Sequence, residues 1–242
     1  TQVRGLTQAQ SNASDGIALL QIAEGAANEI SAILQRMREL SIQSSNDTLT
    51  STERSYTNQE FQALMSEIQR ISQATQYNGM TLLDGESNSF GVSGGPSVLH
   101  IGANNNHNVV GGTIDTINVA VDALTLGALG LTLAEVGISG ADSTNITTQG
   151  NAYDAITTID IALRSINNMR SDMGAYINRL DHAINNIENQ RFNTQDAESR
   201  IRDVDFALET TKFTKTQILT QSAISMLAQA NSVPGLVLSL LG

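Results

Sequence analysis

A seven-residue repeat of large apolar side chains runs through residues 152–196 and constrains the fold more than any other feature. With position a at Ile156, the a and d positions from 156 to 180 are apolar except Arg170. This spacing predicts a coiled-coil helix of about 45 residues, roughly 65 Å long. The predicted seam comprises Ile156, Ile159, Leu163, Ile166, Met173, Ile177, Leu180, Ile184 and Ile187.

Two further helices are expected before this one, at about 14–46 and 52–77. In the first, apolar residues step alternately by three and four positions, at Leu20, Ala23, Ala27, Ile30, Leu34 and Met37. Thr50 and Glu53 have the spacing of a capping box that begins the second helix. Asn78-Gly79 is a turn signal that ends it. Since only a short polar loop joins the two helices, we expect them to be antiparallel.

The middle of the chain differs in composition, because 13 of the 19 glycines lie between Gly79 and Gly150. The apolar runs 98–101 and 117–121 are separated by turn residues, which predicts a β-hairpin region at about 80–121. Residues 122–150 are rich in Gly, Thr and Ser, which predicts a loop with a short helical turn. The predicted fold class is therefore mainly α: an elongated bundle of long antiparallel helices with coiled-coil packing, plus a small β-hairpin region.

Composition excludes several functions. The net charge of −11 argues against nucleic-acid binding, and the absence of cysteine excludes thiol chemistry. The charge is concentrated in residues 71–163, which contain eight acidic residues and no Lys or Arg. We expect no membrane span, no cofactor and no enzymatic activity.

The C-terminal tail, residues 216–242, carries no charged side chain but many large apolar ones. Burying such side chains is worth about 1.5–3 kcal/mol each, and the chain offers them no obvious partner. We therefore predict an assembly or chaperone-binding tail that is disordered from about Arg202 when free. Its apolar residues include Ile218, Leu219, Met226, Leu227, Leu236, Leu238, Leu240 and Leu241. A generic helical bundle and a self-assembling filament subunit both remain compatible with these patterns.

Particular segments resemble a known family. Residues 34–40 read LQRMREL, 77–79 read YNG, 197–205 read AESRIRDVD and 227–231 read LAQAN. In this order, at these ends of the chain, the segments resemble bacterial flagellin over roughly residues 1–121 and 150–242. The resemblance identifies a fragment without the N-terminal segment that pairs with the tail in that family.

The resemblance implies a structural subunit of the flagellar filament, secreted through the growing structure to the cell exterior for swimming motility. Residues 1–196 would form the outer-tube core domain, with a short variable loop region at about 122–150. Residues 197–242 would form the C-terminal inner-tube segment, helical when assembled. Implied partners are other flagellin subunits, an export chaperone, and the filament cap and hook-filament junction proteins. The alternative is a hook-filament junction protein or another secreted coiled-coil structural protein.

The resemblance also implies recognition by innate immune receptors. Positions that match the surface bound by the vertebrate Toll-like flagellin receptor are Gln35, Arg36, Glu39, Leu40 and Glu60. Residues 36 and 40 share a helix face, although Leu40 could instead pack against the next subunit. The terminal leucines resemble the segment read by the cytosolic inflammasome sensor.

Two other groups of residues are candidate sites: three histidines for a metal ion and a pair of aspartates for acid-base catalysis. His100, His107 and His182 have no spacing typical of a zinc site, so we expect no metal there. Asp203 and Asp205 stand beside Arg200 and Arg202, where ion pairing or a helix cap explains them better than acid-base catalysis.

Overall fold

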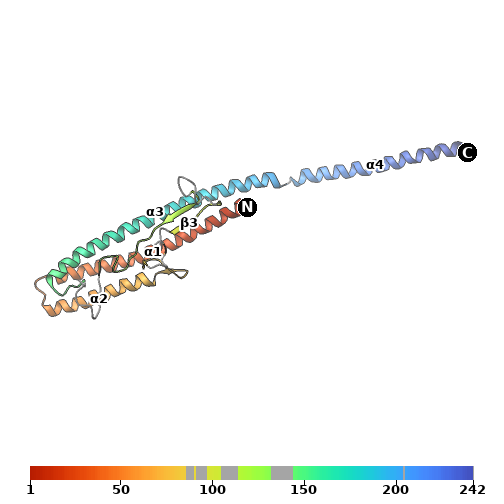
Figure 1. Ribbon diagram of the computed structural model, residues 1–242. Coiled ribbons are helices and arrows are strands. Elements are labelled where there is room, and N and C mark those ends of the chain that lie inside the picture. Colours follow the sequence, from red (N-terminus) through yellow and green to blue (C-terminus); the bar gives the residue numbers. More distant parts are fainter. Residues whose placement is uncertain (86–89, 91–96, 105–113, 132–143, 204, 242) are drawn as a thin grey trace. The chain divides into compact units, whose positions relative to one another are not determined.

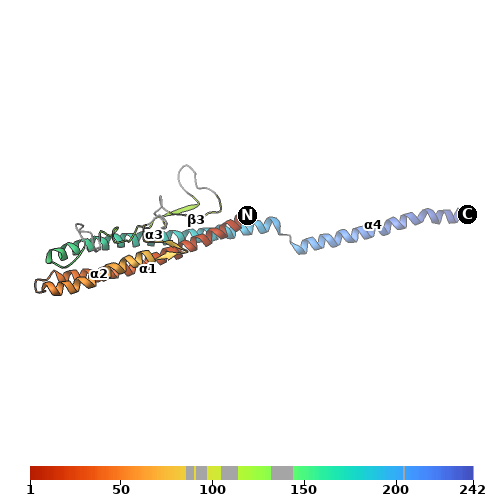
Figure 2. The same ribbon diagram turned by 60° about the horizontal axis from the view of Figure 1, so that its bottom comes forward.

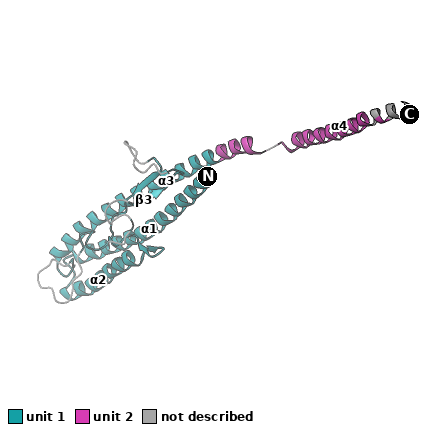
Figure 3. Ribbon diagram, turned by 45° about the vertical axis from the view of Figure 1, so that its right-hand side comes forward, with its two compact units in different colours: residues 1–191 teal, residues 192–242 magenta. Residues whose placement is uncertain are grey.

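The computed structural model describes residues 1–85, 90, 97–104, 114–131, 144–203 and 205–241. It divides into two compact units, Thr1–Arg191 and Phe192–Gly242, shown in different colours in Figure 3. The division falls five residues before the boundary expected after residue 196. The mainly α fold class is confirmed, with four long helices and two short β-hairpins in the described residues.

Helix α1 spans Gln2–Ser44, so it begins 12 residues before the predicted start at about residue 14. The reason is a strict heptad of buried positions that continues to the start of the chain. Alanine and glycine occupy several of these positions, which hid the period from a search for large apolar residues. The buried heptad positions are Leu6, Ala9, Ala13, Gly16, Leu20, Ala23, Ala27, Ile30, Leu34, Met37, Ser41 and Ser44.

Helix α2 spans Ser51–Ala74 and begins with the predicted capping box. The backbone N–H of Glu53 donates to Thr50 Oγ1, and the Glu53 carboxylate accepts from the Thr50 N–H at 2.7 Å. After α2 the chain turns at Asn78-Gly79, both at positive φ, between β1 (Gln76–Tyr77) and β2 (Met80–Thr81). The helix therefore ends three residues before the predicted residue 77, because this hairpin begins there.

Helix α3 spans Gln149–Arg202 and is longer at both ends than the predicted 152–196. It lies beside α1 in both views of the ribbon (Figures 1 and 2). Two ion pairs show that the helices are antiparallel: Arg38 Nε to Asp160 Oδ1 at 2.7 Å, and Arg170 Nη2 to Glu24 Oε1 at 3.9 Å. The predicted antiparallel bundle is present in the first unit.

The core-facing stripe of α3 is displaced from the predicted seam. All five d residues of the seam are buried, whereas the a residues are half-buried. The other buried positions of α3 are Ala152, which lies at d, and Ala155, Ala162 and Met169, which lie at g. The stripe of α3 that faces the bundle core therefore runs along positions d and g. The seam residues fall into two groups: buried Ile159, Ile166, Met173, Leu180 and Ile187, and half-buried Ile156, Leu163, Ile177 and Ile184.

The segment before α3 contributes to the same core. Residues 121–131 and 144–148 pack apolar side chains into the core, including Leu124, Leu126, Leu131 and Ile146. Side chains of α2 hold the backbone of this segment in place. Asn58 Oδ1, for example, accepts a hydrogen bond from the Ile146 N–H at 3.0 Å. Over its described residues, the predicted variable loop region thus contributes buried apolar side chains to the core.

The predicted hairpin is confirmed by β3 (Ser97–His100) and β4 (Thr116–Val119), which pair antiparallel. It lies against the N-terminal half of α1, where Asn12 Nδ2 donates to the His100 carbonyl at 3.0 Å. Leu99 packs so closely on Gly16 that a Cβ at this glycine would lie 2.7 Å from Leu99 Cδ1. Because α2 is shorter than α1, the hairpins take its place over this part of α1.

The second unit contains α4 (Phe206–Leu241). The prediction of disorder from about Arg202 is therefore wrong for this structure. A helix needs only local hydrogen bonds, and Asp205 caps this one by accepting from the backbone N–H of Ala207 at 3.0 Å and of Leu208 at 3.2 Å. The helix-cap explanation of Asp205 is thus the correct one.

Candidate assembly and recognition surfaces

A cluster of ionised side chains joins α1 and α2 on the surface of the first unit. Arg36 Nε and Nη2 donate to the same Glu60 oxygen at 3.0 and 2.9 Å, and Nη1 donates to Glu39 at 3.0 Å. These hydrogen bonds raise the pKa of Arg36 above its ordinary value, and those to Glu60 contribute more than the one to Glu39. The three side chains form an exposed, mixed-charge surface.

The structure corrects one residue of the predicted receptor surface. Gln35, Arg36, Glu39 and Glu60 are exposed, but Leu40 is only 1% exposed and belongs to the bundle core. It lies three residues after Met37 and packs on the same side of α1, toward the other helices. Leu40 therefore cannot meet a partner at this surface while the bundle is folded.

Helix α4 presents apolar side chains without burying them. Every side chain described from Phe206 to Asn231 is exposed. Steps of 7 and 11 residues are close to whole numbers of turns, so Phe206, Phe213 and Ile224 share one face. Leu208, Leu219 and Met226 follow the same steps on a second face. Two separate apolar faces need more than one partner helix.

The threonine hydroxyl groups of α4 need no partner outside the helix. Thr211, Thr214, Thr216 and Thr220 each donate to the carbonyl four residues earlier, at 2.7 to 2.9 Å. Because of these bonds within the helix, a threonine can be buried in an apolar contact without leaving its hydroxyl group unpaired. Ile218, Leu219, Met226 and Leu227 of the predicted tail are exposed, whereas the side chains of Leu236, Leu238, Leu240 and Leu241 lie outside the described part of the chain.

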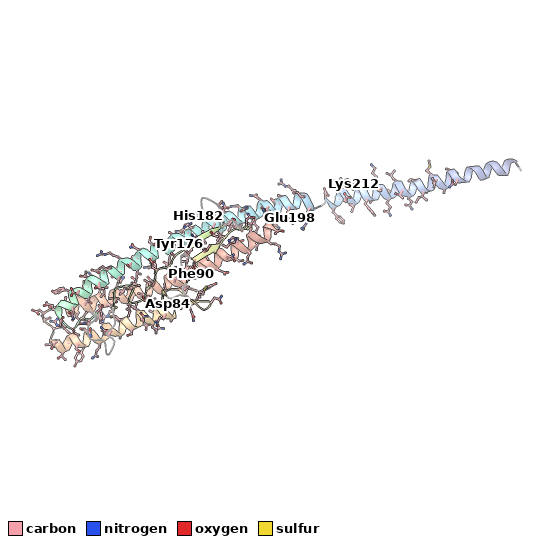
Figure 4. All side chains as sticks on the ribbon, in the orientation of Figure 1. Asp84, Phe90, Tyr176, His182, Glu198 and Lys212 are labelled. Carbon is pink, nitrogen blue, oxygen red and sulfur yellow. The ribbon has the colours of Figure 1, made fainter. Side chains whose placement is uncertain are left out.

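The histidines are not brought together in the described residues. His100 is exposed on β3 and His182 is exposed on α3 (Figure 4), while His107 lies outside the described part. Within the described ranges, no group of three or more His, Cys, Asp or Glu residues is placed to hold a metal ion. Asp203 Oδ1 lies 4.0 Å from Arg202 Nε, which matches the predicted ion pairing.

Helix α1 is long and apolar enough to cross a membrane by length and composition. Its buried heptad accounts for this composition, because one side of the helix forms the bundle core. The apolar content of α1 is thus explained by packing within the first unit.

One surface was not foreseen in the sequence. A groove of about 350 Å³ opens where the hairpins cover the N-terminal half of α1. Its apolar walls are Leu19, Tyr77, Met80, Phe90, Val98 and Leu99, and its polar residues are Asn12, Asp15 and His100. These residues come from four separate segments, so no local spacing could have indicated them.

Taken together, the heptad helices, the exposed two-faced α4 and the surface ion pairs are those of a helical structural protein that associates with other helices. Family models identify it further. The C-terminal helical region of bacterial flagellin matches residues 156–241, and the N-terminal helical region matches residues 1–88. The chain belongs to the bacterial flagellin family.

Individual proteins agree with this assignment. The chain is 43% identical to a flagellin of Halalkalibacterium halodurans over 99% of its own length and 80% of the relative's. It is 40% identical to the flagellar filament 33 kDa core protein of Treponema phagedenis, covering 100% of this chain and 81% of that one. The crystal structure of Bacillus cereus flagellin superposes with a TM-score of 0.57 at 28% identity, covering 78% of this chain and 94% of the other.

Proposed function

We propose that this protein is a structural subunit of a bacterial flagellar filament, located outside the cell and built by self-association for swimming motility. Family membership and the name of the filament core relative support this role. The observation that carries it is α4, whose exposed apolar faces can be buried only by association. A structural role of this kind requires no catalysis, so we also propose that the protein is not an enzyme.

The two faces of α4 favour the filament over the alternative of a free helical bundle. One helix partner would cover the Phe206 face and leave the Leu219 face in water. At about 25 cal/mol per Å² of buried apolar surface, a second contact is strongly favourable. Packing among several neighbouring copies supplies contacts on more than one side. An export chaperone would cover the same faces before assembly, and filament cap and hook-filament junction proteins would meet the subunits at the filament ends.

A truncation tests this proposal. Cells that produce the chain ending at Arg202 should form no filaments and should not swim, while the first unit keeps its helical circular dichroism. A matched full-length variant, Lys212→Arg, keeps the charge of α4 and should assemble normally. Filaments built from the truncated chain would refute the role given to α4. A hook-filament junction protein would instead be found only in a short zone of sheared appendages, which immunogold electron microscopy distinguishes from bulk filament.

We also propose that innate immune receptors recognise this protein. The exposed ion-pair surface of Gln35, Arg36, Glu39 and Glu60 is suited to a Toll-like flagellin receptor, because it offers ordered charges of both signs for charge-assisted hydrogen bonds. The cytosolic inflammasome sensor would read the apolar C-terminal tail instead. The two kinds of recognition thus fall on different units of the chain.

A further inference from the structure

The groove on the first unit exists because α2 and α1 differ in length. α2 ends at Ala74, so the N-terminal half of α1 is covered by the β1–β2 turn, Phe90 and β3 instead. Short hairpins cover a helix less completely than another helix does. The uncovered part is the groove, which is lined by Leu19 of α1 and by Tyr77 and Met80 of the first hairpin.

The chemistry of the groove suits one kind of side chain. Its apolar walls match an aromatic ring, and its volume of about 350 Å³ accommodates one ring and an aliphatic neighbour. Asp15 is exposed and lines the same groove, so its carboxylate is available to accept a hydrogen bond. A tyrosine combines an apolar ring with a hydroxyl donor, and tyrosine is enriched among the residues that dominate protein interfaces.

A matching apolar patch lies at the other end of the same bundle. Tyr153 is 56% exposed and Ile42 is 47% exposed. Arg38 is one turn from Ile42 on α1, and its partner Asp160 is two turns from Tyr153 on α3, so both apolar residues follow the same edge of the antiparallel pair. A hydrogen bond from Gln149 Nε2 to the Ser45 carbonyl, at 3.0 Å, holds the two helices together there.

We propose that Tyr153 and Ile42 of one copy insert into the groove of a second copy. This inference rests on the proposed filament role and names the surfaces of the first unit that would meet in it. The patch and the groove are different surfaces on one chain, so the contact is head to tail and does not close on itself. Repeated contacts of this kind generate an open polymer, which is what a filament requires.

A single chain cannot make this contact with itself. The groove lies at Gly16 of α1 and the patch near Ile42, 26 residues further along one continuous helix. At 1.5 Å per residue the two surfaces are about 39 Å apart. Only another copy can bring Tyr153 to Val98, which is 47% exposed at the groove wall.

Disulfide cross-linking tests the contact directly, because the natural chain has no cysteine. Cells would co-produce two full-length variants, Tyr153→Cys and Val98→Cys, and sheared filaments would be oxidised. We expect a cross-linked dimer that contains one of each variant, because a disulfide needs Cα atoms within about 7 Å. The matched control pairs Val98→Cys with Tyr56→Cys, which replaces a tyrosine of similar exposure on α2, and should give no dimer.

Assembly itself supplies a second measurement. Tyr153→Ala should raise the concentration needed for polymerisation by roughly thirtyfold, as expected for a dominant interface tyrosine, while Tyr56→Ala should not change it. Filaments that contain the chain but show neither the Tyr153–Val98 dimer nor this increase would overturn the contact and leave the filament role intact. Absence of the wild-type chain from any filament would overturn both.

Discussion

The Ser44 hydroxyl, buried at the end of α1, donates a hydrogen bond of 2.5 Å to the backbone carbonyl of Ile146, 102 positions further along the chain. Arg54 strengthens this junction by donating to the Ser44 and Asn46 carbonyls. The bond joins the end of one helix to the segment that leads into another. The closed end of the bundle therefore depends on contacts between residues far apart in the sequence.

Ser44→Ala should destabilise the first unit by about 1–3 kcal/mol, because the buried Ile146 carbonyl loses its donor. Urea unfolding followed by circular dichroism measures this change. Ser45→Ala is the matched control, since the Ser45 hydroxyl bonds only locally to the Ile42 carbonyl. Equal stability of the two variants would contradict the importance of the Ser44 bond.

Thr50→Ala should cost about 1 kcal/mol of stability through loss of the α2 cap. The cap also predicts a pH dependence. Hydrogen bonds from the Thr50 backbone and side chain lower the pKa of Glu53 below its ordinary value of 4.5. Because the folded pKa is the lower one, the contribution of Glu53 to stability is present above pH 4.5 and is lost as the pH falls through the lowered pKa.

Unfolding free energies measured between pH 3 and 7 would show this effect as a smaller acid-induced loss in Glu53→Gln than in the natural protein. Glu67→Gln serves as a comparison, because the pKa of Glu67 is also lowered, by its hydrogen bond with Arg70. The double variant should show a smaller loss than either single one. An unchanged pH profile in Glu53→Gln would show that the cap carboxylate is not coupled to folding.

Gly16→Ala and Gly25→Ala should shift stability in opposite directions. A methyl group at Gly16 meets Leu99 of β3 and must displace it, at a cost of about 1–3 kcal/mol. Gly25 has nothing within 4 Å of such a methyl, so alanine there should stabilise the helix by about 0.5–1 kcal/mol. Thermal unfolding would detect both shifts, and a stabilising Gly16→Ala would mean that β3 does not pack closely on α1.

Ile166→Ala and Ile161→Ala compare the two sides of α3. Ile166 is fully buried, so its truncation should cost about 2–5 kcal/mol, whereas Ile161 is 54% exposed and its truncation should change stability by less than about 0.5 kcal/mol. Chemical denaturation of the two variants gives the difference. A large effect at Ile161 would place a partner on the outer face of α3.

Arg36→Asp should abolish signalling through a Toll-like flagellin receptor, because the substitution replaces the shared donor to Glu39 and Glu60 with a third acid. Arg70→Asp is a control of the same charge change, since Arg70 forms its ion pair with Glu67 on the same helix α2. Receptor-reporter cells treated with each purified variant provide the measurement. Full signalling by Arg36→Asp would contradict the proposed recognition surface.

The presence and type of the helices were predictable because they follow local rules. Heptad spacing indicated α3, and the Thr50–Glu53 pair indicated the start of α2 to within two residues. The first 12 residues of α1 were missed because two of their three buried heptad positions are Ala9 and Ala13, which carry little hydropathic signal. The same local logic assigned Asp205 to a cap.

The sequence alone determined the long heptad helices, the capping box, the β3–β4 hairpin and the apolar character of the tail, since each depends on residues close together in the chain. Only the tertiary structure decided that α3 buries d and g, that Leu40 lies inside the bundle and that a groove opens beside Gly16. These features depend on which segments cover a helix face. Periodicity shows that a helix has an apolar face, whereas the neighbours packed against it decide how much of that face remains for another molecule.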